Sequence, residues 1–243
     1  MKKITMIVAM KQEAVPLIEK LGLAQTSDTN PLLPCKAFSG EYKNLSINLV
    51  TNGSDSVHGV ENVGTQPATL ATYEALRLFS PDLIINAGTC GGFSDHGCKI
   101  GDVYMGERIR FFDRRIPMGD HYEAYGDSNY PCELAVELAQ KLDLPTSIVC
   151  TGNSLDMSPT DEAILRQEPL VNKEMEAAAI AWVASHYQMP LVAVKSVTDL
   201  MDSEHGTADE FSSNLALASK NLQVEVLRLL DLLAQQSLTQ DAA

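Results

Sequence analysis

Short apolar runs alternate with helical patterns along the chain, and this alternation limits the possible folds more than any other feature. The clearest run is Leu191–Thr198, which follows an alanine-rich helical stretch and ends on Asp199. Comparable runs occur at 4–9, 37–39, 45–50, 83–86, 103–109 and 147–150. Near-continuous apolar runs are typical of strands covered on both faces, and their alternation with helices favours an α/β fold. We therefore expect one α/β domain over residues 1–243, a three-layer α/β/α sandwich around a central mixed, twisted sheet.

Helices are expected between these runs. They cover about 12–21, 65–79, 132–142 and 161–167, with a further helix opened by Glu174-Met175-Glu176 and a last one from Thr207. Thr207 and Glu210 have the spacing of a capping box, and the chain after Gln236 is expected to fray. The remaining segments at 24–35, 51–64, 87–92 and 111–127 are expected to be loops. A loop as long as the last one is usually functional or lies at an interface.

Charge and cysteine content exclude several classes of partner. The formal net charge of −14, from 32 acidic and 18 basic residues, argues against nucleic acid and anionic membrane as partners, because both need a basic surface. Five cysteines without CxxC spacing indicate a reducing compartment, and the apolar runs are too short to span a membrane. The scattered histidines lack metal-binding spacing. We expect a cytoplasmic protein without a metal ion or other cofactor.

Acidic residues follow several of the expected strands. Asp199 ends one strand, Glu13 lies in the first turn of the helix after the first strand, and Glu174 and Glu176 precede an alanine-rich helix. Each has an ordinary explanation, since Asp is common in turns and acids are favoured at helix N-termini. Ligands of α/β proteins, however, bind beyond the carboxyl ends of the strands, where all of these residues fall. Their shared location favours a carboxylate-based active site.

The glycine-rich segment Gly88–Gly92 is less specific. It fits neither the dinucleotide fingerprint nor the P-loop spacing, so it indicates only a turn or a close approach of backbone to a ligand. Cys90, within this segment, has no obvious histidine partner and is interpreted as a lining residue. Met175 is compatible with a core position as well as with a ligand contact.

Taken together, five segments carry a resemblance to a known family. They are IVAMKQEAVPL, INAGTCGGF, GNSLDM, KEMEAAAIAWVA and KSVTDL, spread in order over nearly the whole chain. The sequence resembles the methylthioadenosine/S-adenosylhomocysteine nucleosidases of the nucleoside phosphorylase family. VGTQPATLATY, FFDRRIP and TGNSLDMSPTDE resemble the plant-type branch more than the common bacterial one. The resemblance implies a nucleoside phosphorylase-like fold and a hydrolase that cleaves methylthioadenosine, and also S-adenosylhomocysteine, to adenine and a thioribose.

The resemblance also implies roles for individual residues. Asp199 would protonate the purine, Glu13 would activate the attacking water, and Glu176 would bind the ribose hydroxyls. The other implied substrate-binding residues are Met10, Thr89, Cys90, Gly91, Leu155, Glu174 and Met175. The family is dimeric, so the partners implied are a nucleoside thioether, water and a second copy whose loop near 111–122 completes the neighbour's site. The chemistry agrees with these roles, because cleavage of an N-ribosidic bond leaves positive charge on the sugar and negative charge on the base.

Departures from the family patterns bear on the reaction and its substrate. Phosphorylases of the family place an arginine where this chain has Asn86, and a carboxylate at Glu13 would repel phosphate, so we expect hydrolysis rather than phosphorolysis. Lys195 replaces an arginine of the bacterial pattern, Leu155 a phenylalanine, and Ala208 an aromatic ring over the alkylthio group. This smaller cover leads us to expect methylthioadenosine as the better substrate. The alternatives are an adenosine or purine phosphorylase and a non-catalytic nucleoside-binding protein, which should have lost one of the acids.

Overall fold

The computed structural model describes residues 1–204 and 206–241, with side chains as far as residue 238. The strands are β1 (Lys3–Val8), β2 (Ala24–Gln25), β3 (Lys36–Tyr42), β4 (Leu45–Thr51), β5 (Leu83–Gly92), β6 (Val103–Phe111), β7 (Tyr130–Pro131), β8 (Thr146–Thr151), β9 (Val171–Glu174) and β10 (Leu191–Leu200). The helices are α1 (Lys11–Leu21), α2 (Thr65–Phe79), the 3₁₀ turn η1 (Ser94–His96), α3 (Asp120–Asp127), α4 (Glu133–Leu142), α5 (Pro159–Leu165), α6 (Ala177–His186) and α7 (Thr207–Asp241). No helix within this part of the chain is both long and apolar enough to cross a membrane.

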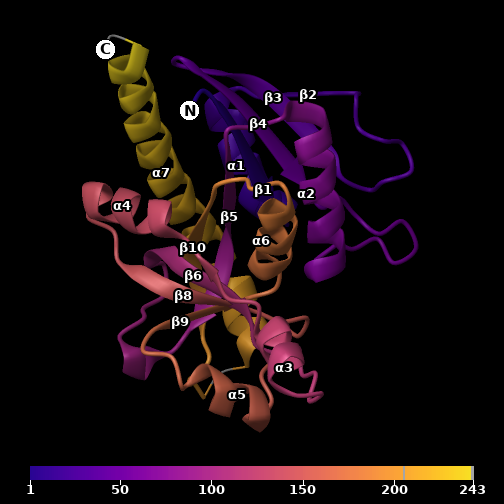
Figure 1. Ribbon diagram of the computed structural model, residues 1–243, viewed down its shortest axis with the longest axis vertical. Helices are drawn as coiled ribbons and strands as arrows, with labels where there is room; N and C mark the ends of the chain where they lie inside the picture. The colour runs from indigo at the N-terminus through magenta and orange to yellow at the C-terminus, as the bar shows by residue number, and fades with distance from the viewer. Residues whose placement is uncertain (205, 242–243) are drawn as a thin grey trace.

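A central mixed sheet carries the fold, as expected from the sequence (Figure 1). Strand β1 is parallel to both β4 and β5, β5 is parallel to β10, and β3 and β4 form an antiparallel hairpin. Helix α1 packs against α7, and α2 packs against α6, so helices cover the sheet as two layers. The carboxyl ends of β1, β5 and β10 therefore lie at one edge, where a ligand site is expected.

One half of the sheet closes on itself, which the sequence did not indicate. The strands β5, β10, β6, β8 and β9 each pair with the next, and β9 pairs back to β5 at Gly91 and Gly92. The first half of β5 pairs with β1 instead. This closure brings β9 and β10 to opposite edges of the glycine-rich end of β5.

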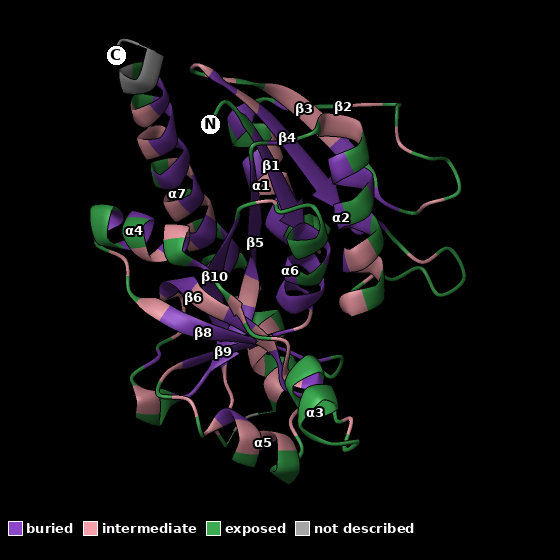
Figure 2. Ribbon diagram, in the orientation of Figure 1, coloured by how far each residue is buried: buried purple, intermediate pink, exposed green. Residues whose placement is uncertain are grey.

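The core consists of small and branched apolar side chains. It follows the central strands of the sheet, which are coloured as buried in Figure 2. Residues 83–87 of β5 and 192–194 of β10 are buried, as continuous apolar runs require. Helix α6 is buried on nearly all sides because it is largely alanine.

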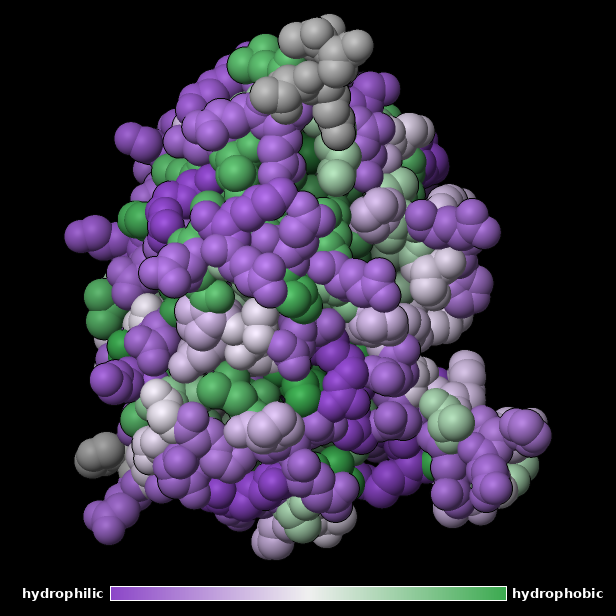
Figure 3. Space-filling view, turned by 60° about the vertical axis from the view of Figure 1, so that its left-hand side comes forward, coloured by the Kyte–Doolittle hydropathy of each residue, from purple (hydrophilic) through white to green (hydrophobic). Residues whose placement is uncertain are grey.

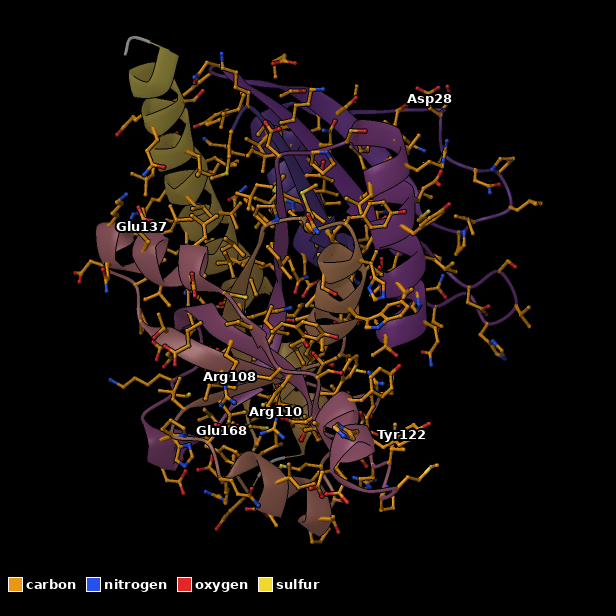
Figure 4. The ribbon with its side chains drawn as sticks, viewed as in Figure 1. Asp28, Arg108, Arg110, Tyr122, Glu137 and Glu168 are labelled. Atoms are coloured by element: carbon orange, nitrogen blue, oxygen red, sulfur yellow. The ribbon has the colours of Figure 1, made fainter. Side chains whose placement is uncertain are left out.

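On β6, Arg108 and Arg110 both pair with Glu168, which follows α5, at 2.5 and 2.6 Å (Figure 4).

Two expectations near the site were wrong. The chain does not leave the sheet after Asn86, because β10 pairs alongside β5 as far as Gly92 and keeps the glycine-rich segment extended. Glu174-Met175-Glu176 does not open a helix, because Glu174 is the last residue of β9, which pairs with β8 and β5. The helix begins only at Ala177.

Three local expectations also need correction. Residues 120–127, expected as loop, form α3. Glu210 does not form the expected capping box, because Thr207 is the first helical residue and the Glu210 carboxylate accepts hydrogen bonds from Leu200 N and Ser203 Oγ. The last helix does not fray after Gln236 but continues to Asp241.

Candidate active site

A cavity of about 280 Å³ lies at the carboxyl ends of β1, β5 and β10. All ten residues expected at the site line it: Met10, Glu13, Thr89, Cys90, Gly91, Leu155, Glu174, Met175, Glu176 and Asp199. The lining also includes residues that the sequence reasoning missed: Ala9, Val63, Lys173, Thr198 and Phe211. Segments that are about two hundred residues apart in the sequence thus meet around one concave space, as ligand sites of proteins do.

Glu13 is held at the start of α1 by backbone and side-chain donors. Its Oε1 accepts hydrogen bonds from Thr89 N and Thr89 Oγ1, both at 2.7 Å, and its Oε2 accepts one from Met10 N at 3.1 Å. Burial raises the pKa of the Glu13 carboxyl, whereas the bonds from Thr89 and the charge of Lys195 lower it. Thr89, expected to bind substrate, therefore also fixes this carboxylate.

Glu176 belongs to the same cavity wall. Its Oε1 accepts a hydrogen bond of 2.7 Å from Gly64 N, at the residue that precedes α2. Burial, followed by repulsion from Glu174, raises the Glu176 pKa from its ordinary value of 4.5 to about 7. The carboxyl can therefore exchange a proton near neutral pH.

The Glu174 carboxylate is fully engaged by the protein. It accepts hydrogen bonds from the Lys195 ammonium at 2.9 Å, from the Thr151 hydroxyl, and from the backbone N–H groups of Glu176 and Ala177. Lys195 and Glu174 are both buried, so each neutralises the other. This arrangement anchors the first turn of α6 and, with it, Glu176.

Asp199 faces the cavity because of an irregularity in β10. The register of β10 against β5 shifts between Val197 and Asp199, and a bulge of this kind re-aims side chains next to many active sites. Asp199 Oδ1 accepts a hydrogen bond of 2.8 Å from Thr198 Oγ1. Burial raises the Asp199 pKa, while the Thr198 hydroxyl and the charge of Lys173 oppose the rise.

Gly91 is required by this placement. A Cβ on Gly91 would lie 2.6 Å from Asp199 Oδ2 and 3.1 Å from Met201 Cγ. The backbone of β5 thus approaches the carboxylate more closely than any other residue would allow.

The aromatic cover of the cavity comes from Phe211 rather than from the position of Ala208. Ala208 is exposed and does not line the cavity, whereas Phe211, about one turn further along α7, does. The expectation of a smaller cover was therefore wrong. In the sequence, Phe211 belongs to an apolar stripe of this helix that continues through Leu215, Ala218 and Leu222, and periodicity alone does not tell a core position from a lining position.

The other polar groups give no sign of metal or thiol chemistry in the described residues. Burial raises the Cys90 pKa well above its ordinary value, so the thiol stays protonated and lines the cavity. The described segments contain no group of three or more His, Cys, Asp or Glu side chains arranged to hold a metal ion. All five cysteines are free and buried.

Comparison with known proteins agrees with the fold. A model of the phosphorylase superfamily matches residues 3–231, and the chain belongs to this superfamily. Within it, the chain belongs to the plant-type branch of the methylthioadenosine nucleosidases. It is 38% identical to a 5′-methylthioadenosine nucleosidase of Arabidopsis thaliana, over 97% of this chain and 89% of the relative. It is 40% identical to a 5′-methylthioadenosine/S-adenosylhomocysteine nucleosidase of the same plant, over 97% and 93%.

Structural similarity is equally extensive. The apo structure of Arabidopsis thaliana 5′-methylthioadenosine nucleosidase superposes with a TM-score of 0.92 at 38% identity, covering 95% of each chain. A crystal structure of an MTA/SAH nucleosidase superposes with a TM-score of 0.91 at 40% identity, again over 95% of each chain. The nucleoside phosphorylase-like fold is therefore confirmed.

Proposed function

We propose that this protein is a hydrolase that cleaves the N-ribosidic bond of 5′-methylthioadenosine, and also of S-adenosylhomocysteine, to release adenine and the thioribose. The observation that carries the proposal is the convergence of Glu13, Glu176 and Asp199 on one cavity. The names of the two plant relatives, each matched over nearly its full length, support the same substrates.

The environments of the acids suit different roles in this reaction. Asp199 acts as the general acid toward the purine, since burial favours its protonated form. Glu13 acts as the base toward water, since burial raises its pKa and makes the carboxylate a stronger base, while three hydrogen-bond donors and the charge of Lys195 limit that rise. Glu176 binds the ribose hydroxyls. Negative charge on this side of the cavity also stabilises the positive charge that develops on the sugar.

Hydrolysis is favoured over phosphorolysis by the charges around the cavity. Asn86, where phosphorylases carry an arginine, is buried, and its Nδ2 donates a hydrogen bond to Ile7 O. Lys173 is the one basic side chain among the described lining residues, and it already binds two backbone carbonyls. A phosphate ion would instead meet Glu13 and Glu176.

An assay for adenine release tests this proposal. The enzyme is incubated with methylthioadenosine in phosphate-free buffer and in buffer with phosphate, and both products are separated by chromatography. We expect equal rates and free methylthioribose, and a loss of turnover on the order of a hundred- to ten-thousand-fold in Asp199→Asn. Phosphate-dependent formation of a ribose 1-phosphate would instead indicate a phosphorylase, and tight binding without turnover in the wild type would indicate a nucleoside-binding protein.

Apolar lining residues of the cavity support methylthioadenosine as the better substrate. Met10, Val63 and Phe211 supply an uncharged surface that suits a methylthio group but offers no ion pair to an amino-acid tail. We expect a higher kcat/KM for methylthioadenosine than for S-adenosylhomocysteine, measured by adenine release from each. Equal values would contradict this preference.

We also infer that the protein acts in the cytoplasm as a homodimer in which the loop near 111–122 completes the neighbour's site. Free cysteines support the compartment. For the dimer, the support is a set of exposed apolar side chains within residues 57–73 and 118–125, comprising Val57, Val60, Val63, Leu70, Tyr73, Met118, Tyr122 and Tyr125. Val63 both lines the cavity and is 44% exposed, so this wall is open to a partner. Exposed apolar groups in such numbers are typical of an interaction surface.

A further inference from the structure

Lys173 occupies a position that none of the proposed roles explains. The closed part of the sheet places it in β9 directly opposite Gly91, while Asp199 in β10 lies opposite Gly91 on the other edge of β5. Directly paired residues point to the same face of a sheet. Because Gly91 has no side chain, the Asp199 carboxylate can lie over its backbone, and Gly91, Lys173 and Asp199 all line the cavity.

The Lys173 ammonium group binds the turn that follows β8. Its Nζ donates hydrogen bonds to Ser154 O at 2.7 Å and to Leu155 O at 2.8 Å. The side chain passes within 5.9 Å of the Phe112 ring centre, and the residue is only 6% exposed. Leu155, by contrast, is 41% exposed. One buried cation thus connects an exposed turn of the cavity wall to the sheet.

We propose that Lys173 is a positioning residue that holds the 154–155 turn against the base-binding end of the cavity and places a positive charge beside the general acid. The inference rests on the proposed function, since it needs a purine between Asp199 and the turn. It deepens that function by assigning two separable effects to the Lys173 side chain. Its hydrogen bonds to the 154–155 turn set the affinity for the base, and its charge sets the pH range in which Asp199 is protonated.

The charges around Asp199 make the second effect testable. Thr198 Oγ1 on β10 donates to the carboxylate, Lys173 approaches from β9, and Glu210 approaches from α7. Lys173 and the Thr198 hydroxyl lower the Asp199 pKa, whereas Glu210 and burial raise it. Loss of the lysine charge therefore raises the Asp199 pKa, so the acid stays protonated at higher pH.

The experiment compares Lys173→Met, which removes the charge, with Lys173→Arg, which keeps it but does not fit the buried space of the amine. Kinetics of adenine release from methylthioadenosine are measured across pH. Loss of hydrogen bonds from a buried charged donor is expected to raise KM roughly tenfold or more in both variants, with a smaller change in kcat. The alkaline limb of kcat/KM, which reports the free enzyme, is expected to move to higher pH in K173M and to stay in place in K173R.

Lys141→Met serves as the matched control, because Lys141 lies on the surface of α4 and pairs with Glu137. It should retain wild-type kinetics. A wild-type KM in K173M or K173R would contradict the role of Lys173 in holding the 154–155 turn. An unshifted alkaline limb of kcat/KM in K173M would contradict the effect of its charge on Asp199. If K173M does not fold by circular dichroism, Lys173→Gln replaces it as the uncharged variant. If the wild type releases adenine and the Lys173 variants have the same kinetics, this inference is wrong but the proposed function stands. If neither the wild type nor K141M releases adenine, the proposed function is wrong as well.

Discussion

At the scale of single residues, identical carboxyl groups acquire different properties from their surroundings. Glu174 is neutralised by Lys195 and surrounded by donors, Glu13 accepts three hydrogen bonds, and Glu176 has one backbone donor and a carboxylate neighbour. Asp199 is buried beside a glycine. Differences of this kind are how one site keeps one acid protonated and another ionised.

The close approach of Gly91 to Asp199 makes a residue-scale prediction. In Gly91→Ala the new Cβ would lie 2.6 Å from Asp199 Oδ2, so the carboxyl group must move. A displacement of about 1 Å at a catalytic group can cost roughly a hundredfold in rate, and we expect a fall of that order in kcat with little loss of thermal stability. Gly88→Ala is the matched comparison, because its Cβ would make ordinary contacts of 3.5 Å. Equal activity of the two variants would contradict the prediction.

Glu176 makes a prediction about pH and stability. Its folded-state pKa is raised from 4.5 to about 7, so the native state binds more protons than the unfolded state between these values. The free energy of unfolding therefore decreases as the pH rises from 4.5 to about 7. Glu176→Gln removes this contribution, so its unfolding free energy, measured by urea denaturation at several pH values, should decline less than that of the wild type. If the unfolding free energies of the wild type and Glu176→Gln decline equally with pH, the prediction is wrong.

At the scale of elements, the site depends on how strands end. β5 continues through its glycines because β10 supports it, and the bulge near Thr198 turns Asp199 into the cavity. β9 is a short strand of four buried residues that carries Lys173 and Glu174 to the same place. Helix α7 contributes Phe211 to the cavity and also packs on β10 and α1, so it connects the site to the core.

The packing of α7 can be tested with paired truncations. Leu222→Ala deletes a fully buried side chain, and a loss of about 2–5 kcal/mol in the free energy of unfolding is expected. Leu217, five residues earlier on the same helix, is 48% exposed, and Leu217→Ala should cost well under 1 kcal/mol. Chemical denaturation of both variants measures the difference. Similar losses would show that the helix does not bury the face that contains Leu222.

At the scale of the whole molecule, the surface differs between faces. The face in Figure 3 is predominantly hydrophilic, in keeping with a net charge of −14, and its hydrophobic residues are scattered. The loop before α2, helix α2 itself and α3 lie together on one side in Figure 1. Tyr122, on the outer side of α3 in Figure 4, is 49% exposed. The extent of a single domain over 1–243 stays a prediction.

The proposed dimer predicts the behaviour of this apolar side. The wild type should elute with twice the 26.4 kDa chain mass in size-exclusion chromatography with light scattering. The double variant Val60→Asp, Tyr73→Asp should be monomeric and less active, because charges in an apolar interface are unfavourable and the neighbour's loop is lost. The control variant Leu217→Asp changes an exposed position of α7 and should remain dimeric. A monomeric wild type with full activity would contradict the dimer.

Local sequence was enough to predict the α/β class and to place Glu13, Glu174, Glu176 and Asp199 at one site, for two reasons, whereas the roles of the other expected cavity residues were implied by the family resemblance. Apolar runs indicate buried strands, and acids placed after such runs indicate the edge where ligands bind. The closed ring of strands, the extension of β5, the strand formed by residues 171–174 and the position of Phe211 were decided by tertiary structure. The same holds for Lys173, which lies beside Asp199 only because both pair with Gly91. Pairing between distant strands depends on register across the sheet, and no local pattern of residues specifies that register.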